Sequence, residues 1–435
     1  MTATIRLLRL FFVYCGALAA MTAFLIIANI IPNGPIWDHV SQSLPSENYV
    51  MSPGDLVRLD QFTECISVTI GLTPKDVSIQ PVIRAIGAPT LGPCEISRKT
   101  LAKEFGGPNY QPYYYWRYWH GYQILSRPIL ALMDTRALRL IVFLIVCTSL
   151  FFFLWAVRKS LGAGYAFTFS ISLFSAPLYS QFLLVSHCGV WIVGMIFASF
   201  LLFAIRERRQ YFESYCLEMF FAVGMLTAYV DLSTSPLVTL TIPLLVLFWC
   251  DAWPRTLSVR SSAATAAILC IYWFLGYASC WAAKWILATV FLNSASIADA
   301  ANQVLRRISR NVPGLDDGQA TSLKSIYDNF IQCRNGFLIL GIAVALRLLV
   351  IRRYPLRAVL SFDRLATAAW IVSLPIIWLA LVRNHSIIHA FFVAPILIPS
   401  FALLLATLWP EKLIGGTIKQ RRAIERSRTL NPGGN

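Results

Sequence analysis

The sequence predicts an all-α polytopic membrane protein with about ten transmembrane helices. Hydrophobic residues make up 57% of the 435 residues and charged residues only 13%, and the mean hydropathy is +0.62. Apolar stretches of about 20 residues, the length that crosses a bilayer, recur along most of the chain. These observations exclude a water-soluble enzyme, a collagen-like rod and a disordered chain.

The net charge of +16 is explained first by membrane topology. Arginines and lysines gather in short loops and near the two ends of the chain, and basic residues in short loops stay on the cytoplasmic side of a membrane. Both termini are therefore expected in the cytoplasm, and residues 409–435 form a basic tail. We expect no nucleic-acid partner.

Hydropathy and the basic loops together place ten spans. They lie near residues 10–31, 138–157, 163–182, 188–205, 214–230, 236–250, 264–290, 335–351, 365–382 and 390–408. The first span could be mistaken for a signal peptide, but its apolar length and the lack of a small-residue cleavage site favour an uncleaved helix.

The spans divide the chain into six parts. These are the cytoplasmic N-terminus with the first helix (1–31), a large first outer loop (32–137), transmembrane helices 2–7 (138–290), a second outer loop (291–334), helices 8–10 (335–408) and the tail (409–435).

Both outer loops contain predicted surface helices. In residues 54–72 apolar side chains recur at spacings of three or four, the pattern of a helix on a membrane surface. Residues 112–133 carry the Tyr and Trp density of the headgroup level, and IADAANQVLRRISR in the second loop is a further candidate. Cys65 and Cys94 could form a disulfide in the first loop if that compartment is oxidising.

All five histidines map to outer loops or to outer ends of spans. They are His39, His120, His187, His385 and His389. His385 and His389 are spaced i, i+4, which suits two metal ligands on one helical face, so a divalent metal ion is an open alternative. No helical Glu accompanies them as in zinc proteases. Anchoring of helices at the interface is the other explanation, and the better one for His187.

Two carboxylates lie at the expected outer surface. Asp38 follows the first span by seven residues, beside His39, and a carboxylate there can act as a general base. An ordinary loop aspartate is the alternative. Asp231 lies in the turn between two spans, where ionisable groups are functional candidates. The alternative for Asp231 is capping of the next helix, which Pro236 would open.

Basic residues are predicted at the same level. Lys284 lies in the outer half of GYASCWAAKWILATVF. Snorkelling of the side chain to the headgroups would explain why a lysine is tolerated there, and a bound lipid phosphate would explain why a lysine is present. Arg383 reaches this level from another helix. Arg117 and His120, in YYYWRYWHGY, suit a platform for sugar rings or a phosphate, and equally an interfacial aromatic belt.

These features resemble the C-type (GT-C) superfamily of integral-membrane glycosyltransferases. The resemblance is architectural: an acidic residue soon after the first span, a large first outer loop with surface helices, and basic residues near the outer leaflet. It implies a polyprenyl-phosphate sugar as donor, Asp38 as base or acceptor-orienting group, and Lys284 or Arg383 as the cations that hold the donor phosphate. The paired acidic residues often found in such enzymes are replaced here by Asp38 and His39.

The segments RYWHGY, DLSTSPLVTL, GYASCWAAKW and NHSIIH also resemble a largely uncharacterised group of bacterial polytopic membrane proteins. This resemblance implies that one site contains Arg117, His120, Asp231, Lys284, His385 and His389.

The sequence therefore predicts transfer of one sugar from an outer-leaflet polyprenyl phosphate to an envelope glycan or lipid acceptor. The site would face the periplasm of a bacterial inner membrane. Asp38 would be the general base, Asp231 a second acidic group for the acceptor or a metal, and Lys284 with Arg383 the phosphate clamp. The further substrate-binding residues would be His39, Arg117, His120, His385 and His389. No nucleotide-binding glycine loop is present or required.

Two alternatives remain. A polysaccharide or lipid-linked oligosaccharide transporter would place ionisable residues through the whole membrane depth, whereas the predicted ones gather at one surface. A membrane acyltransferase would need a histidine that a cytosolic thioester donor can reach, and none is expected on that side.

Overall fold

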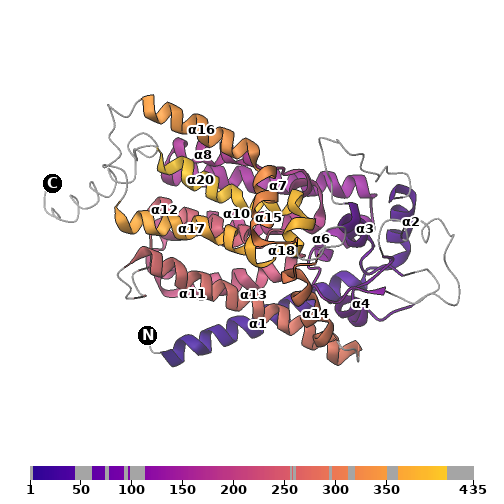
Figure 1. Ribbon diagram of the computed structural model, residues 1–435. Coiled ribbons are helices and arrows are strands. Elements are labelled where there is room, and N and C mark those ends of the chain that lie inside the picture. The colour runs from indigo at the N-terminus through magenta and orange to yellow at the C-terminus, as the bar shows by residue number, and fades with distance from the viewer. Residues whose placement is uncertain are drawn as a thin grey trace, which may run out of the picture.

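A computed structural model of the chain consists almost entirely of helices. The structure describes residues 3–44, 61–73, 78–92, 97, 113–254, 257, 261–292, 296–311, 319–349 and 361–408. Long helices lie side by side in a bundle, and short elements gather at one end of it (Figure 1). We call the end that carries α2 (Asn33–Ser43), α3 (Gln61–Thr69) and α4 (Pro81–Gly87) the loop end, and the opposite end, where α1 (Ala3–Ile30) begins, the terminal end.

Six described helical segments are long and apolar enough to cross a membrane. They are Thr4–Ile30, Thr135–Leu161, Val185–Glu207, Ser262–Leu292, Phe362–Leu381 and Ala390–Thr407. A seventh span results if α15 (Ser322–Gln332) and α16 (Arg334–Leu349), which are bent by 72° at their junction, count as one. The predicted all-α membrane class is therefore confirmed, whereas the number of ten spans is not.

The missing spans are helices that are short, broken or more polar. Residues 163–182 form α8 (Ala163–Ser172), the 3-10 turn η2 (Leu173–Ser175) and α9 (Tyr179–Leu183). Pro177 lies in the gap, where it has no N–H to donate and disfavours helix before it. Residues 214–230 lie within α11 (Arg209–Val230), and residues 236–250 form α12 (Val238–Cys250), which has only 13 residues.

α12 forms the centre of the bundle. Every one of its residues is buried, as expected for a helix that is apolar on all sides. It packs against α11, α10 (Val185–Glu207), α17 (Phe362–Leu381) and α20 (Ile398–Thr407). α7 (Thr135–Leu161) packs on the far side of α10, and α13 (Ser262–Leu292) packs on α11.

Two glycines bring α11 and α13 into direct backbone contact. Gly224 on α11 lies against the backbone of Trp273, and Gly276 on α13 lies against the backbone of Phe221. A Cβ atom at either glycine would overlap a carbonyl oxygen of the opposite helix. Small residues permit such close approach of membrane helices, and here they fix the turn after α11 relative to the part of α13 that carries Lys284.

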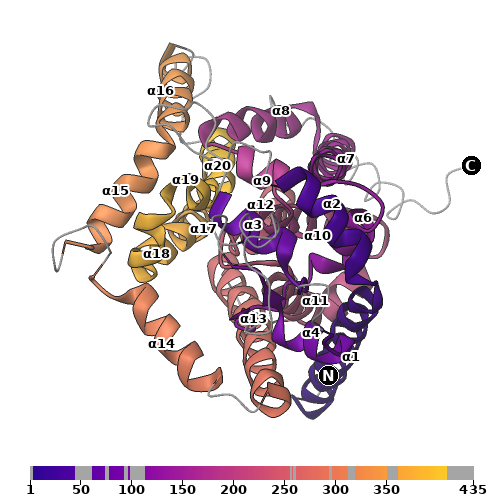
Figure 2. The same cartoon turned by 90° about the vertical axis from the view of Figure 1, so that its right-hand side faces the viewer.

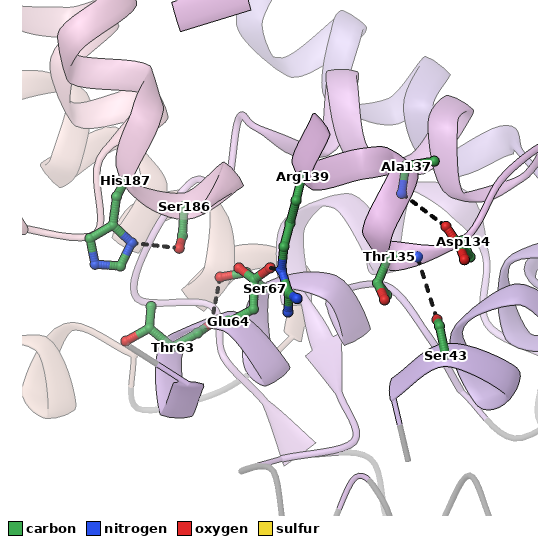
Figure 3. Close-up of polar contacts among 10 residues, drawn as sticks. All are labelled: Ser43, Thr63, Glu64, Ser67, Asp134, Thr135, Ala137, Arg139, Ser186 and His187. Carbon is green, nitrogen blue, oxygen red and sulfur yellow. Dashed lines mark hydrogen bonds and ion pairs between the residues drawn. The ribbon is translucent and has the colours of Figure 1, made fainter. Parts of the chain in front are cut away.

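The first predicted outer loop folds onto the loop end. The buried carboxylate of Glu64 on α3 accepts a hydrogen bond from Arg139 Nε of α7 at 3.2 Å (Figure 3). α6 (Gln123–Leu130) is attached to the end of α1, because the buried Arg127 donates to the carbonyl oxygens of Ala28 (2.9 Å) and Ile31 (2.8 Å). A short antiparallel pair, β1 (Pro89–Thr90) and β2 (Tyr113–Tyr114), completes this part.

The apolar pattern predicted for a surface helix at 54–72 is satisfied by protein instead of lipid. Of the apolar residues in this pattern, Ile66 on α3 and Ile70 just beyond it are buried, and they cluster with Ala88 and Tyr115. An amphipathic pattern looks the same in either environment. Cys65 is disulfide-bonded, and the eight other described cysteines form no disulfide. Cys94, the partner expected from the sequence, and residues 54–60 lie outside the described residues.

The second predicted outer loop contains α14 (Ser296–Ile308) and then α15. Figure 2 looks onto the loop end and places α14, α15 and α18 (Arg383–Ile388) on one side and α2 and α6 on the other. α18 is followed by α19 (Ala390–Val393), the 3-10 turn η5 (Ala394–Leu397) and α20.

Substitution of Gly276 by Ala should destabilise the bundle by about 1–3 kcal/mol, because the new methyl group forces α11 and α13 apart. Gly341→Ala on α16 is the matched control, since no atom lies within 4 Å of a Cβ there, and it should be neutral or slightly stabilising. Denaturant unfolding in detergent measures both. Equal stability of the two variants would contradict the close contact.

Candidate functional site

The turn after α11 is organised around Asp231. Its Oδ1 accepts hydrogen bonds from the Thr234 backbone N–H (2.9 Å) and the Thr234 hydroxyl (2.7 Å). Between them Ser233 adopts a left-handed conformation, with φ of 65°. An aspartate that bonds the backbone a few residues onward is a common way to hold such a turn. Asp231 therefore stabilises its own turn. The N-cap residue of α12 is Leu237, and its side chain makes no capping hydrogen bond.

The environment of Asp231 favours proton exchange near neutral pH. The side chain is buried, and Oδ2 has no hydrogen bond of standard geometry from the described residues. Burial raises the pKa of this carboxyl to about 6, against the lowering effect of the Thr234 hydrogen bonds. A carboxyl group with such a pKa suits a general acid or base.

Arg307 of α14 reaches the same turn. Its Nη1 donates to the Ser233 hydroxyl at 2.8 Å, and its Nη2 donates to the Tyr118 hydroxyl. Both acceptors are neutral, so these bonds hold the guanidinium without cancelling its charge. Burial lowers the pKa of Arg307 to about 10, and the group stays positively charged at neutral pH.

His385 of α18 contacts the turn from another side. A carbonyl oxygen can only accept, so the 2.9 Å contact between His385 Nε2 and the Ser233 carbonyl identifies Nε2 as the protonated nitrogen. The ring of His389 lies 4.7 Å from that of His385, centroid to centroid, and Phe392 packs against both. Burial, with the nearby His389 and Arg307, lowers the pKa of His385 well below 6.5, and the ring is therefore neutral.

His187 lies beneath this group. Its ring packs on Phe392 at 4.9 Å, and its Nδ1 forms a 2.9 Å hydrogen bond with the Ser186 hydroxyl (Figure 3). The ring is fully buried, which agrees with a packing role.

The segment 113–122 packs into the bundle through its backbone and its rings. His120 is buried, with Nε2 donating to the Tyr115 carbonyl at 2.7 Å and Nδ1 in a 2.9 Å bond with the Tyr122 hydroxyl. The next residue, Gly121, donates its N–H to the Tyr229 carbonyl at 2.8 Å and has Tyr229 directly over its Cα. Arg117 forms an ion pair with Asp299 of α14 at 3.0 Å.

Lys284 and Arg383, the phosphate clamp expected from the sequence, donate to backbone carbonyls. Lys284 Nζ bonds the carbonyl oxygens of Ala85 (3.2 Å) and Ile86 (2.7 Å) at the end of α4, where a cation is favoured by the helix dipole. The side chain is 1% exposed, so it is enclosed by protein and does not snorkel. Arg383 Nε donates to the Ser309 carbonyl at 3.3 Å.

Asp38 and His39 lie on α2, apart from this group. α2 packs on α6 and α7, and both views place it away from α14 and α18 (Figures 1 and 2). Asp38 is exposed, and His39 Nδ1 donates to the Leu130 carbonyl at 2.9 Å, which attaches α2 to α6.

Seven of the nine candidate residues belong to one connected group at the loop end. Its links are the contacts of Arg307 with Tyr118 and Ser233 and the ring contacts of segment 113–122. His385 joins through the Ser233 carbonyl and His389 through the ring of His385, and Arg383 bonds Ser309, the residue after α14. The seven are Arg117, His120, Asp231, Lys284, Arg383, His385 and His389.

Sequence reasoning missed Arg307, the residue that connects α14 to this group. The available signal was its helical position. Arg307 shares a face of α14 with Ser296, Ala300 and Gln303, all small or uncharged, whereas Arg306 points about 100° away. An arginine on the face with small residues is the one expected to meet the protein.

Metal binding has no support from side-chain grouping within the described ranges. No set of three or more His, Cys, Asp and Glu side chains there is arranged to hold an ion. The pair His385 and His389 alone would supply two ligands.

Comparisons of the chain with family models, with curated proteins and with solved structures find no match. The function must therefore be inferred from the geometry of the site.

Acidification should destabilise the protein through His120. Burial lowers the pKa of His120 to about 3, whereas an unfolded histidine titrates near 6.5. The folded state thus excludes a proton that the unfolded state binds. The contribution of His120 to the free energy of unfolding is therefore complete above pH 6.5 and decreases as the pH falls towards 3. Between pH 6.5 and 5 the loss from this residue reaches about 2 kcal/mol.

Thermal unfolding in detergent at pH 7.5 and pH 5 measures this loss. His120→Asn should show a smaller pH dependence, and asparagine tolerates the left-handed backbone at this position, where φ is 57°. An unchanged pH dependence in this variant would contradict a buried neutral His120.

Proposed function

We propose that this protein is a GT-C-type membrane glycosyltransferase that transfers a sugar from a polyprenyl-phosphate donor to a glycan or lipid acceptor. One observation carries the proposal. At the loop end of an apolar helical bundle, the buried carboxyl group of Asp231 shares a turn with Ser233. Arg307 donates hydrogen bonds to the neutral hydroxyls of Ser233 and Tyr118, its two hydrogen-bond acceptors among the described residues. A base and a phosphate-binding cation on one turn are what glycosyl transfer from a lipid phosphate requires.

Arg307 would bind the phosphate of the donor. An arginine makes strong, paired hydrogen bonds to phosphate oxygens. When the bond between sugar and phosphate breaks, negative charge grows on the departing phosphate, and a fixed guanidinium stabilises that charge. Lys284 and Arg383 would add positive potential behind it while keeping their bonds to carbonyl groups.

Asp231 would accept the proton of the attacking acceptor hydroxyl. It takes this role in place of Asp38, because Asp38 lies on α2 and Asp231 lies on the turn that binds Arg307. His385, neutral and fixed on Ser233, and Arg117 with its neighbouring aromatic rings would orient the sugar and the acceptor. A divalent metal ion is not needed for these steps.

The proposal includes the ten-span topology, with both termini in the cytoplasm and the loop end in the periplasm of a bacterial inner membrane. The basic residues that end α7 and α10 and begin α11 support this orientation, because such residues stay cytoplasmic. α11, α12 and the α8–α9 pair would supply spans beyond the long helices.

Transport of a polysaccharide or a lipid-linked oligosaccharide is the second candidate, and one residue favours it. Glu218 is buried within α11, and its Oε1 has no hydrogen-bond partner among the described residues. An ionisable group inside a membrane bundle often marks a translocation path.

Mass spectrometry of envelope glycolipids and polysaccharides tests the enzyme directly. Cells that lack the gene should lose one sugar, and wild-type protein should restore it. Arg307→Gln and Asp231→Asn should reduce its transfer by about 10²-fold or more, the usual contribution of a general base or a transition-state donor. Arg306→Gln, an equal charge change at an exposed position of the same helix, should restore it fully.

Two further variants distinguish the alternatives. If Asp38→Asn fails and Asp231→Asn restores the sugar, the base is Asp38. If glycans remain intact but accumulate on the wrong side, and Glu218→Gln fails where Asp231→Asn succeeds, the protein is a transporter and the proposal is wrong.

A further inference from the structure

α14 presents three different faces to its surroundings. Its buried or half-buried face carries Ser296, Ala300, Gln303 and Arg307, spaced at three or four residues. A second face is apolar and exposed, with Ile297, Val304, Leu305 and Ile308. The third is polar and exposed, with Asn302 and Arg306. A helix at the edge of a protein in a membrane interface needs these three surfaces, one each for protein, lipid and water.

The position of α14 identifies what covers its apolar face. The helix starts at Ser296, four residues beyond the last residue of α13, so it begins where that span leaves the bilayer. The end of α13 is itself apolar and exposed, with Val290 71% and Ile286 54% accessible. On α14, Ile297 is 53% and Leu305 60% accessible. The apolar surface of the span therefore continues onto α14.

We infer that α14 lies in the membrane–water interface with this apolar face among the lipids, and that the lipid contact holds Arg307 on the turn of Asp231. The occupant is the lipid leaflet at the loop end. A second copy of the chain would also cover apolar side chains, but the continuity with the surface of α13 favours lipid.

Polar contacts connect the protein face of α14 to the site, and among the described residues of this face only the small Ala300 is a buried apolar side chain. The polar contacts are the ion pair of Asp299 with Arg117 and the hydrogen bonds of Arg307 to Ser233 and Tyr118. The large apolar side chains of α14 are on its exposed face. Burying them would stabilise the position of the helix, and this free energy is gained only when lipid covers that face. Since α14 is one helix, the depth at which lipid holds Leu305 also sets the height of Arg307.

The inference deepens the proposed function, because it rests on Arg307 as the cation of the site. The site would be complete only when α14 is inserted in the leaflet, and the phosphate of a lipid substrate would meet Arg307 at headgroup depth. Lipid composition would thereby regulate the activity.

Photocrosslinking tests the lipid contact without any activity measurement. p-Benzoylphenylalanine is placed at position 304 on the apolar face or, as the matched control, at position 302 on the polar face of the same helix, about 160° away. Both proteins are irradiated in nanodiscs of phosphatidylethanolamine and phosphatidylglycerol, and peptides are analysed by mass spectrometry. We expect a lipid adduct at 304 and none above background at 302. A covalent protein dimer at 304, or equal lipid adducts at both positions, would overturn the inference.

Chemical modification tests the connection to Arg307. In nanodiscs, phenylglyoxal should modify the exposed Arg306 and spare Arg307. In the Val304→Gln/Leu305→Gln double variant, Arg307 should lose this protection while Arg306 reacts as before. Protection of Arg307 that survives in the double variant would show that lipid does not hold it. These readouts are separate from the glycan assay, so an inactive protein with the expected adducts would disprove the proposed function and leave the membrane contact of α14 intact.

Discussion

The loop end depends on cations that donate their hydrogen bonds to neutral oxygens. Arg127 and Lys284 bind carbonyl groups at helix ends, Arg383 binds a loop carbonyl, and Arg307 binds two hydroxyls. Burying a charge is costly unless such bonds satisfy it. The same bonds attach α6 to α1 and α4 to α13. Carbonyl and hydroxyl oxygens stabilise a cation without neutralising it, so Arg127 and Arg307 keep their positive charge.

The positive charge of Arg307 gives the site its chemical character. Asp231 and Arg307 both bond to the turn 231–235 but not directly to each other, and Ser233 lies between them. A carboxyl group in a direct ion pair would have a low pKa and would be a poor base. Held apart, Asp231 keeps a raised pKa and Arg307 keeps an unneutralised charge. We propose that a bound phosphate supplies the counter-charge of Arg307.

Sequence patterns predicted the membrane class and most long helices, because composition and hydropathy directly reflect the apolar surroundings of a membrane helix. They could not predict the interruption at Pro177, or whether the apolar face of α3 meets lipid or protein, since both satisfy the same spacing. Seven candidate residues lie together because polar groups at one membrane surface are driven to one end of the bundle. Asp38 lies on α2, apart from these residues, because nearness to a span in sequence does not determine on which side of the loop end a residue lies. Arg307 differs from Arg306 only by helical rotation, which short motifs do not show.

The proposed binding of a lipid phosphate by Arg307 is measured most directly by a ligand-induced shift in thermal unfolding. Purified protein in detergent is compared with a short-chain prenyl phosphate and with the matching prenol. We expect that the phosphate stabilises the protein and the prenol does not. The stabilisation should be weakened by salt, lost in Arg307→Gln and retained in Arg306→Gln. Equal stabilisation by the prenol, or an unchanged shift in Arg307→Gln, would contradict it.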